Sequence, residues 1–184
     1  SLDEQVKLLD AFLNELGIGK IAIVGHGLGA LVAMKFAIRF RQSVDRVMAI
    51  NCPLSYDAVT ARLRTSSPQE LSDWLSNRSP EASTALSDAP KTDVKAIAAS
   101  VAGLQTDNLY GNFRNMDVPC LLVYGEKDQA ITVPTYETAT STYTHQIILD
   151  GSGHFPMIEE TIKFNRLLTD FLALPSGISP SELQ

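Results

Sequence analysis

The stretch that decides the fold runs Ile21-Ala22-Ile23-Val24-Gly25-His26-Gly27-Leu28-Gly29-Ala30. Its first half is short, apolar on both alternating faces and closed by Gly25, a pattern typical of a strand buried on both sides in a parallel sheet. Its second half opens a helix that we expect over residues 28–40, with small alanines that allow close packing. A strand that ends in Gly-x-x-x-Gly and passes directly into a helix makes a tight turn, which needs small residues at Gly25 and Gly29 and lifts Gly27 above the sheet.

Further helices and strands are predicted on both sides of this unit. Apolar residues recur at helical spacing over 2–16, before Gly17. A second strand over 46–51 completes a unit of strand, helix and parallel strand. Beyond it we expect strands at 120–124 and 146–149, a weak helix at 135–142 and a final helix at 162–171. The sequence therefore predicts an α/β fold, a parallel sheet with flanking helices.

The chain divides into a core, an insertion and a tail. Residues 1–51 and 115–174 carry the alternating pattern and form the core. Residues 52–114 are rich in Ser, Thr, Asp and Ala, and we expect them to form short helices. These helices are predicted to start at the breaks Ser67-Pro68, Ser79-Pro80 and Ala89-Pro90. Residues 175–184 are polar, so we expect a flexible tail.

Composition excludes several classes of partner. The chain has 184 residues, 45% of them hydrophobic, and a formal net charge of −6 with no run of Lys or Arg, which argues against nucleic acid and favours small molecules or proteins.

Cys52 and Cys120 lie in apolar contexts, so we predict buried structural thiols, no disulfide framework, no metal site and no cofactor. No segment is long enough for a membrane span, and residues 1–20 lack a signal-peptide pattern, which predicts a cytoplasmic protein.

The segment Gly25-His26-Gly27-Leu28-Gly29 resembles the nucleophile elbow of the α/β-hydrolase superfamily, in particular its lid-bearing esterases and lipases, with glycine in place of the nucleophile. Two further segments resemble the family in the required chain order. Residues 124–128 look like the acid-bearing loop, which assigns the acid to Asp128, and residues 151–156 look like the base-bearing loop, which assigns the general base to His154.

Each of these residues has a simpler interpretation when taken alone. Asp128 is then a solvated turn aspartate, and His154 is a surface residue of a glycine-rich loop. Together, in this order and each at the carboxyl end of a predicted parallel strand, they indicate a site.

Four other ionisable residues near these segments are assigned no catalytic role. We expect His26 to pack or hydrogen-bond beside its strand, and His145 to lie on the surface before a strand. Glu159 and Glu160 start the final helix, where acidic side chains complement the helix dipole.

The resemblance also implies that residues 52–114 form a lid over the site. Apolar residues of this segment either line an acyl pocket or merely dock the lid helices, and we favour docking for most of them. The residues concerned are Leu71, Trp74, Leu75, Val94, Ile97, Val101 and Leu104.

The chain departs from the family in two respects. Gly27 has no side chain to attack a carbonyl, so we expect the protein to be nearly inactive, with roughly 10³–10⁴-fold acceleration left if the oxyanion hole survives. Leu28 provides one oxyanion N–H, but the family's early strands, which bring the other, have no counterpart here. Residues 21–24 then form a bare sheet edge, so we predict a homodimer through this edge, or a missing N-terminal half that exists as a separate or disordered piece.

The leading functional hypothesis is a hydrolase of a small ester, amide or related carbonyl substrate, in which Gly27 is an introduced or incidental replacement. The paired Asp128 and His154 favour it. The alternative is a non-catalytic module that binds a ligand or a partner on the same fold, which Gly27 favours. A relative with an aspartate nucleophile for halides or epoxides is disfavoured, because position 27 would need a carboxylate.

Overall fold

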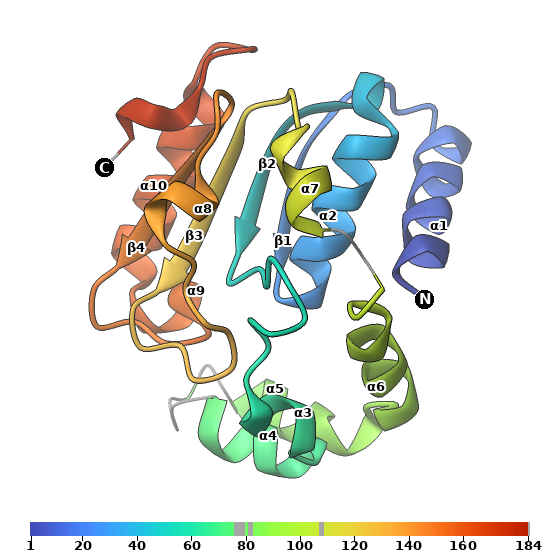
Figure 1. Cartoon of the computed structure of the whole chain (residues 1–184), viewed down its shortest axis with the longest axis vertical. Helices are drawn as coiled ribbons and strands as arrows, with labels where there is room; N and C mark the ends of the chain where they lie inside the picture. Colours follow the sequence, from blue (N-terminus) through green and yellow to red (C-terminus); the bar gives the residue numbers. More distant parts are fainter. Residues whose placement is uncertain (76–79, 81–82, 107–108, 184) are drawn as a thin grey trace.

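A four-stranded parallel sheet organises the chain (Figure 1). In this computed structural model its order is β1 (Ile21–His26), β2 (Val44–Ile50), β3 (Cys120–Gly125) and β4 (Thr144–Leu149), and all three pairings are parallel. The structure describes residues 1–75, 80, 83–106 and 109–183. The predicted α/β class, with helices flanking a parallel sheet, is confirmed.

One face of the sheet is covered by the helices that flank the first strand. They are α1 (Leu2–Glu15) and α2 (Leu28–Arg39), together with α7 (Leu109–Arg114). Ser1 and Glu4 form a capping box that starts α1, and Leu2, Val6 and Leu13 are its buried residues. They share a core with the alanines and Phe36 of α2, which places α2 directly on the sheet.

The opposite face carries the last helix. The last helix is α10 (Thr161–Ala173). Two short helices precede it in the second half of the chain, α8 (Tyr136–Ala139) and α9 (Pro156–Glu159). In the first half, a short 3₁₀ turn, η1 (Arg41–Ser43), leads into β2. Phe164, Leu167 and Phe171 of α10 pack against apolar residues of β2, β3 and β4. Ile162, the first residue of the helix that we predicted over 162–171, points to solvent with 87% of its surface exposed.

The insertion is helical and lies beyond the carboxyl ends of the strands, where Figure 1 shows α3 to α6 gathered. The bounds are α3 (Ala61–Thr65), α4 (Pro68–Leu75), α5 (Ser83–Asp88), η3 (Ala89–Lys91) and α6 (Val94–Gly103). A helix starts at Pro68 as predicted, whereas the break at Ala89-Pro90 begins only a 3₁₀ turn. The helix that follows is capped by Asp93, and the predicted break at Ser79 lies outside the described residues.

The C-terminal tail differs from the flexible segment that we expected. Residues Pro180–Glu182 form a 3₁₀ helix, η4, and Pro180 is buried. Leu183 packs against the core on the α10 side, and the Ser176 hydroxyl donates a hydrogen bond of 2.7 Å to Asp45. The composition is polar, but in the structure Pro180 is buried and Leu183 packs against apolar residues of the core.

Strand β1 lies at one edge of the sheet and is less buried than predicted. In the part of the chain that the structure describes, β1 pairs with β2 alone, and Val24 is 44% exposed. The α10-side core draws residues from β2, β3 and β4 but none from β1, which explains why Ala22 and Val24 stay exposed. The strand is therefore half buried rather than buried on both faces.

Two other expectations concern burial. Cys52 and Cys120 are free and buried, as predicted, and burial raises the pKa of the Cys120 thiol to about 12. Among the described residues, no helix combines the length and the apolar character that a crossing of a lipid bilayer requires.

Candidate active site

The turn between β1 and α2 is centred on Gly27. Its backbone has φ 58° and ψ −120°, a conformation that residues with a side chain adopt only under strain. The Gly27 N–H donates to the Ile50 carbonyl at 2.9 Å, and the Gly27 carbonyl accepts from the Ala30 N–H. These hydrogen bonds tie the turn to β2 and to the first turn of α2, so its position is well determined.

The two flanking glycines behave differently. A Cβ at Gly25 would collide with the backbone of Gly29 and would lie 2.7 Å from the Cα of Ala30, so the close approach of strand and helix requires glycine there. A Cβ at Gly29 would meet nothing within 4 Å. The expected requirement for a small side chain at Gly29 is therefore wrong, because its own Cβ would point into open space.

Opposite Gly27 lies the imidazole of His154. A Cβ built on Gly27 would lie 3.7 Å from His154 Nε2. A hydroxyl one bond further out would be within hydrogen-bond reach of this nitrogen, which is the relation between a nucleophile and its base. The turn thus presents position 27 to His154 although Gly27 itself offers no reactive group.

The other nitrogen of the imidazole is held by Asp128. His154 Nδ1 lies 2.9 Å from Asp128 Oδ2, and the Asp128 side chain is fully buried. The loops that carry them are joined by backbone hydrogen bonds, including one of 2.7 Å from the Lys127 N–H to the Ser152 carbonyl. Gly125 allows this approach, because a Cβ there would collide with the Gly153 carbonyl. The structure therefore brings Gly27, Asp128 and His154 to one place at the carboxyl ends of β1, β3 and β4.

Asp128 is kept ionised by its partners. Burial acts to raise the pKa of its carboxyl, but hydrogen bonds from His154 and Asn51 and from the Ala130 N–H hold that pKa below its ordinary value. An ionised Asp128 orients the imidazole of His154 and stabilises its protonated form.

Asn51 is a site residue that the sequence analysis did not identify. Its side-chain amide donates to Asp128 Oδ2 at 2.6 Å, and its backbone has φ 50°, in the left-handed region that asparagine tolerates better than most residues. It follows β2 directly, at the same edge of the sheet as the other site residues. Its position in the sequence, directly after a buried parallel strand, could have identified it, because such sheets bind ligands at the carboxyl ends of their strands.

His26 joins the elbow to the base-bearing loop. Its Nε2 lies 2.6 Å from the His154 carbonyl oxygen, and its ring centroid is 4.7 Å from that of His154 and 5.0 Å from that of Phe155. Since a carbonyl only accepts, Nε2 carries the proton and donates. Burial, together with the neighbouring His154, lowers the pKa of His26 to about 4, so the ring is neutral near pH 7. His26 is placed to hold the loop rather than to transfer protons.

Glu159 holds the same loop from the other side. We expected Glu159 to start the final helix, but it ends α9, and its carboxylate turns back to accept hydrogen bonds of 3.1 Å from the N–H groups of Gly153 and Phe155. Glu160 is the residue before the first turn of α10, but its side chain makes no capping hydrogen bond; its Oε2 lies 3.9 Å from Lys163 Nζ. His145 lies inside β4, which begins two residues earlier than predicted, and it is partly exposed.

Leu28 is the first residue of α2. Its N–H is one of the donors that a helix leaves without an intrahelical acceptor, and it directly follows position 27. This is the place of an oxyanion donor. In the described part of the chain, no group of three His, Cys, Asp or Glu side chains converges to hold a metal ion.

Four of the apolar residues named in the insertion line a cavity of about 180 Å³: Leu71, Val94, Ile97 and Val101. Leu104 instead belongs to the core below, and the side chains of Trp74 and Leu75 lie outside the described part of the structure. The residues that line the cavity all belong to the insertion, and Gly27, Asp128 and His154 are not among them.

Known proteins are similar to this chain in sequence and in fold. The sequence model of the Alpha/beta hydrolase family matches residues 1–166. A pimeloyl-acyl-carrier-protein methyl ester esterase of Sodalis glossinidius is 30% identical over 90 residues, which cover 47% of this chain and 35% of the esterase.

An uncharacterised protein of Mycobacterium tuberculosis is 24% identical over 87% of this chain, and this chain spans 58% of its length. Among solved structures, an enol-lactonase from Burkholderia xenovorans superposes with a TM-score of 0.79 at 19% identity, covering 95% of this chain and 74% of the enol-lactonase.

Proposed function

Because the chain belongs to the alpha/beta hydrolase family, we propose that its site acts on a small ester, amide or related carbonyl substrate, and that turnover is slow because Gly27 stands at the nucleophile position. The observation that carries this proposal is the hydrogen-bonded pair of His154 and Asp128. Nε2 of His154 faces position 27 and lies 3.7 Å from the Cβ that a side chain would place there. A relative named as a methyl ester esterase supports the class of reaction.

With glycine at position 27, a water molecule must act as the nucleophile. His154 Nε2 accepts a proton from the water, whose oxygen adds to the substrate carbonyl while the carbonyl electrons move to its oxygen. The N–H of Leu28 donates a hydrogen bond to the oxyanion that forms. When the intermediate collapses, the imidazolium returns the proton to the leaving group. Asp128 stabilises the imidazolium throughout, and no acyl-enzyme forms.

With serine at position 27, the same groups support an acyl-enzyme route. The serine hydroxyl transfers its proton to His154 as it attacks, the leaving group departs with that proton, and water then releases the acyl group. The backbone at position 27 already has the strained conformation that presents such a side chain to the base.

The alternative is a module that binds a ligand without turnover, and Gly27 is the observation that favours it. In that case the pair of Asp128 and His154 has only a structural role. A ligand would then saturate the site without product formation, and His154→Ala would bind it as well as the parent does.

Hydrolysis of a panel of p-nitrophenyl esters with two to eight acyl carbons distinguishes the two functions. We expect Gly27→Ser to raise kcat/KM by at least ~100-fold over the parent and to show a burst of p-nitrophenolate. Gly27→Ala is the matched control, since it adds a Cβ and the same backbone strain but no hydroxyl. A folded Gly27→Ser variant that gains no activity on any ester would overturn the proposal.

A further inference from the structure

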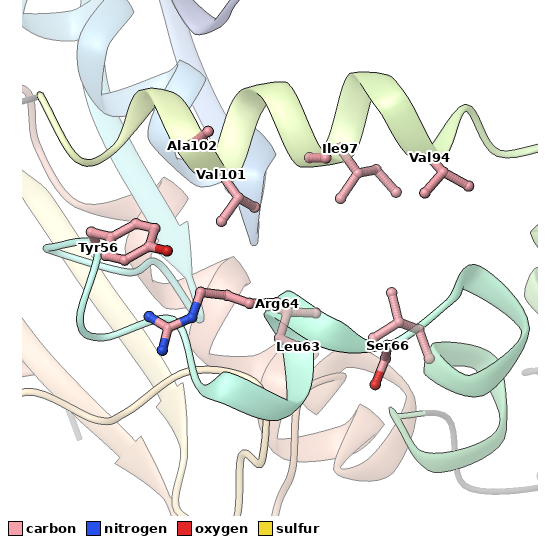
Figure 2. A pocket seen from close by; sticks show the side chains of 10 residues that line it. Tyr56, Leu63, Arg64, Ser66, Val94, Ile97, Val101 and Ala102 are labelled. Carbon is pink, nitrogen blue, oxygen red and sulfur yellow. The ribbon is translucent and has the colours of Figure 1, made fainter.

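The cavity in the insertion has apolar walls and one polar side. Val94, Ile97 and Val101 project from α6 toward Leu63 of α3, as Figure 2 shows. The volume of about 180 Å³ is smaller than the ~300–1,000 Å³ of pockets for drug-sized ligands, so it suits a molecule with few carbon atoms.

Arg64 supplies the polar side. Figure 2 shows its side chain reaching from α3 beneath Val101 and Tyr56. Its guanidinium carbon lies 4.8 Å from the centroid of the Tyr56 ring, which holds the guanidinium by a cation–π contact. Among the described residues that line the cavity, Arg64 is the only charged one, and no described carboxylate forms an ion pair with it. Arg62, on the same short helix, donates instead to Gln129.

We propose that this cavity binds a small carboxylate with an apolar chain. The chain lies between α3 and α6, and the carboxylate accepts two hydrogen bonds from the planar guanidinium of Arg64, a geometry that arginine favours. On a protein with a formal net charge of −6, a guanidinium that pairs with no described carboxylate attracts an anion to the apolar cavity beside it. Since none of Gly27, Asp128 and His154 lines the cavity, the proposal does not rest on the proposed hydrolysis.

The test is a titration of the full chain with hexanoate and with hexanamide, followed through ¹H–¹⁵N amide shifts. We expect hexanoate to bind at least ~10-fold more tightly than its neutral amide, with the largest shifts in residues 63–66 and 94–102. Arg64→Gln should reduce the affinity for hexanoate to that for hexanamide and leave the affinity for hexanamide unchanged. Lys95→Gln removes an exposed positive charge of α6 that does not line the cavity, and it should change neither affinity.

Two further variants separate this site from the catalytic one. Ala98→Phe fills the cavity and should abolish binding of both ligands, with a thermal melt to show that the chain is folded. His154→Ala should bind hexanoate as the parent does. The proposal is overturned if both ligands bind equally, if neither binds, if Arg64→Gln has no effect, or if the shifts centre on Gly27 and His154.

Discussion

His26 is buried against the loop that it holds, and this burial has a consequence for pH dependence. The folded chain keeps the pKa of His26 at about 4, whereas in the unfolded chain it returns to 6.5. Between these values the unfolded state binds more protons, so the free energy of unfolding falls as the pH falls from 6.5 to 4. The loss from this single group amounts to about 3 kcal/mol.

We therefore predict that His26→Gln, which keeps a side-chain N–H donor but does not titrate, flattens this part of the stability profile. Urea unfolding at a series of pH values measures it. The comparison with the parent cancels the other groups with shifted pKa values, because they are present in both proteins. Among them are His145, whose lowered pKa acts in the same direction, and Asp128, whose lowered pKa also makes stability fall with falling pH. Equal acid slopes for parent and variant would show that His26 is not buried as a neutral ring.

Asn51 combines a hydrogen bond to a buried carboxylate with a left-handed backbone. Asn51→Gly removes the side chain and suits the backbone, so it should lower the free energy of unfolding by about 2 kcal/mol through the lost hydrogen bond to Asp128. Asn51→Ala loses the same bond and should be less stable than the glycine variant by a further ~1 kcal/mol. Chemical denaturation of the pair measures both contributions, and an alanine variant as stable as the glycine variant would contradict the backbone assignment.

At the scale of elements, the base-bearing loop between β4 and α9 is fastened by hydrogen bonds from several parts of the chain. Glu159 accepts from two of its N–H groups, the loop after β3 donates to its Ser152 carbonyl, and His26 donates to the His154 carbonyl. None of these contacts is close in sequence except that of Glu159. The loop is therefore positioned chiefly by its neighbours in space.

Hydrogen exchange tests the role of Glu159. Glu159→Ala leaves the N–H groups of Gly153 and Phe155 without their acceptor, so we predict that their exchange becomes faster by roughly 10–100-fold. Glu160→Ala is the matched control, since it removes the neighbouring acid without touching the loop. Unchanged exchange at Gly153 and Phe155 in the Glu159 variant would contradict the assignment.

The sequence predicts the elements better than the contacts between them. Apolar periodicity and glycine breaks locate all four strands to within about two residues, because these signals are local. The sequence also predicts that Gly27, Asp128 and His154 lie close together, because each follows a parallel strand and such strands place their carboxyl ends at one edge of the sheet. Asn51 escaped the sequence analysis because its contact with Asp128 arises only when separate segments meet. The contacts of Glu159 are local, but they were missed because that residue was assigned to the start of the final helix.

The errors have the same origin. The tail looked flexible by composition, but Pro180 and Leu183 find apolar surface on the folded core. Val24 looked buried by pattern, but α10 covers the neighbouring strands and not its own. Burial depends on which helix lies over which strand, and periodicity within one strand carries no information about that.

At the scale of the whole molecule, the described structure leaves strand β1 at an edge of the sheet. We predict that two copies of the chain associate through this edge, because Val24 is exposed there and, in the described structure, the strand pairs on one side alone. Sedimentation equilibrium should show a dimer for the parent and a monomer for Val24→Lys. Ile162→Lys, at a highly exposed apolar residue of α10, is the control and should remain dimeric. A well-folded monomeric parent would contradict this prediction.

The central claim is that Asp128 and His154 form a competent acid and base, and that the site lacks only a nucleophilic side chain at position 27. Intact mass after incubation with a fluorophosphonate tests it most directly, because the serine hydroxyl displaces fluoride only when its proton can pass to His154. We predict one adduct on Gly27→Ser, mapped to position 27, and none on the parent or on Gly27→Ala. The double variant Gly27→Ser/His154→Ala should react at least ~100-fold more slowly. A folded Gly27→Ser variant that stays unmodified, or that reacts equally fast without His154, would contradict the claim.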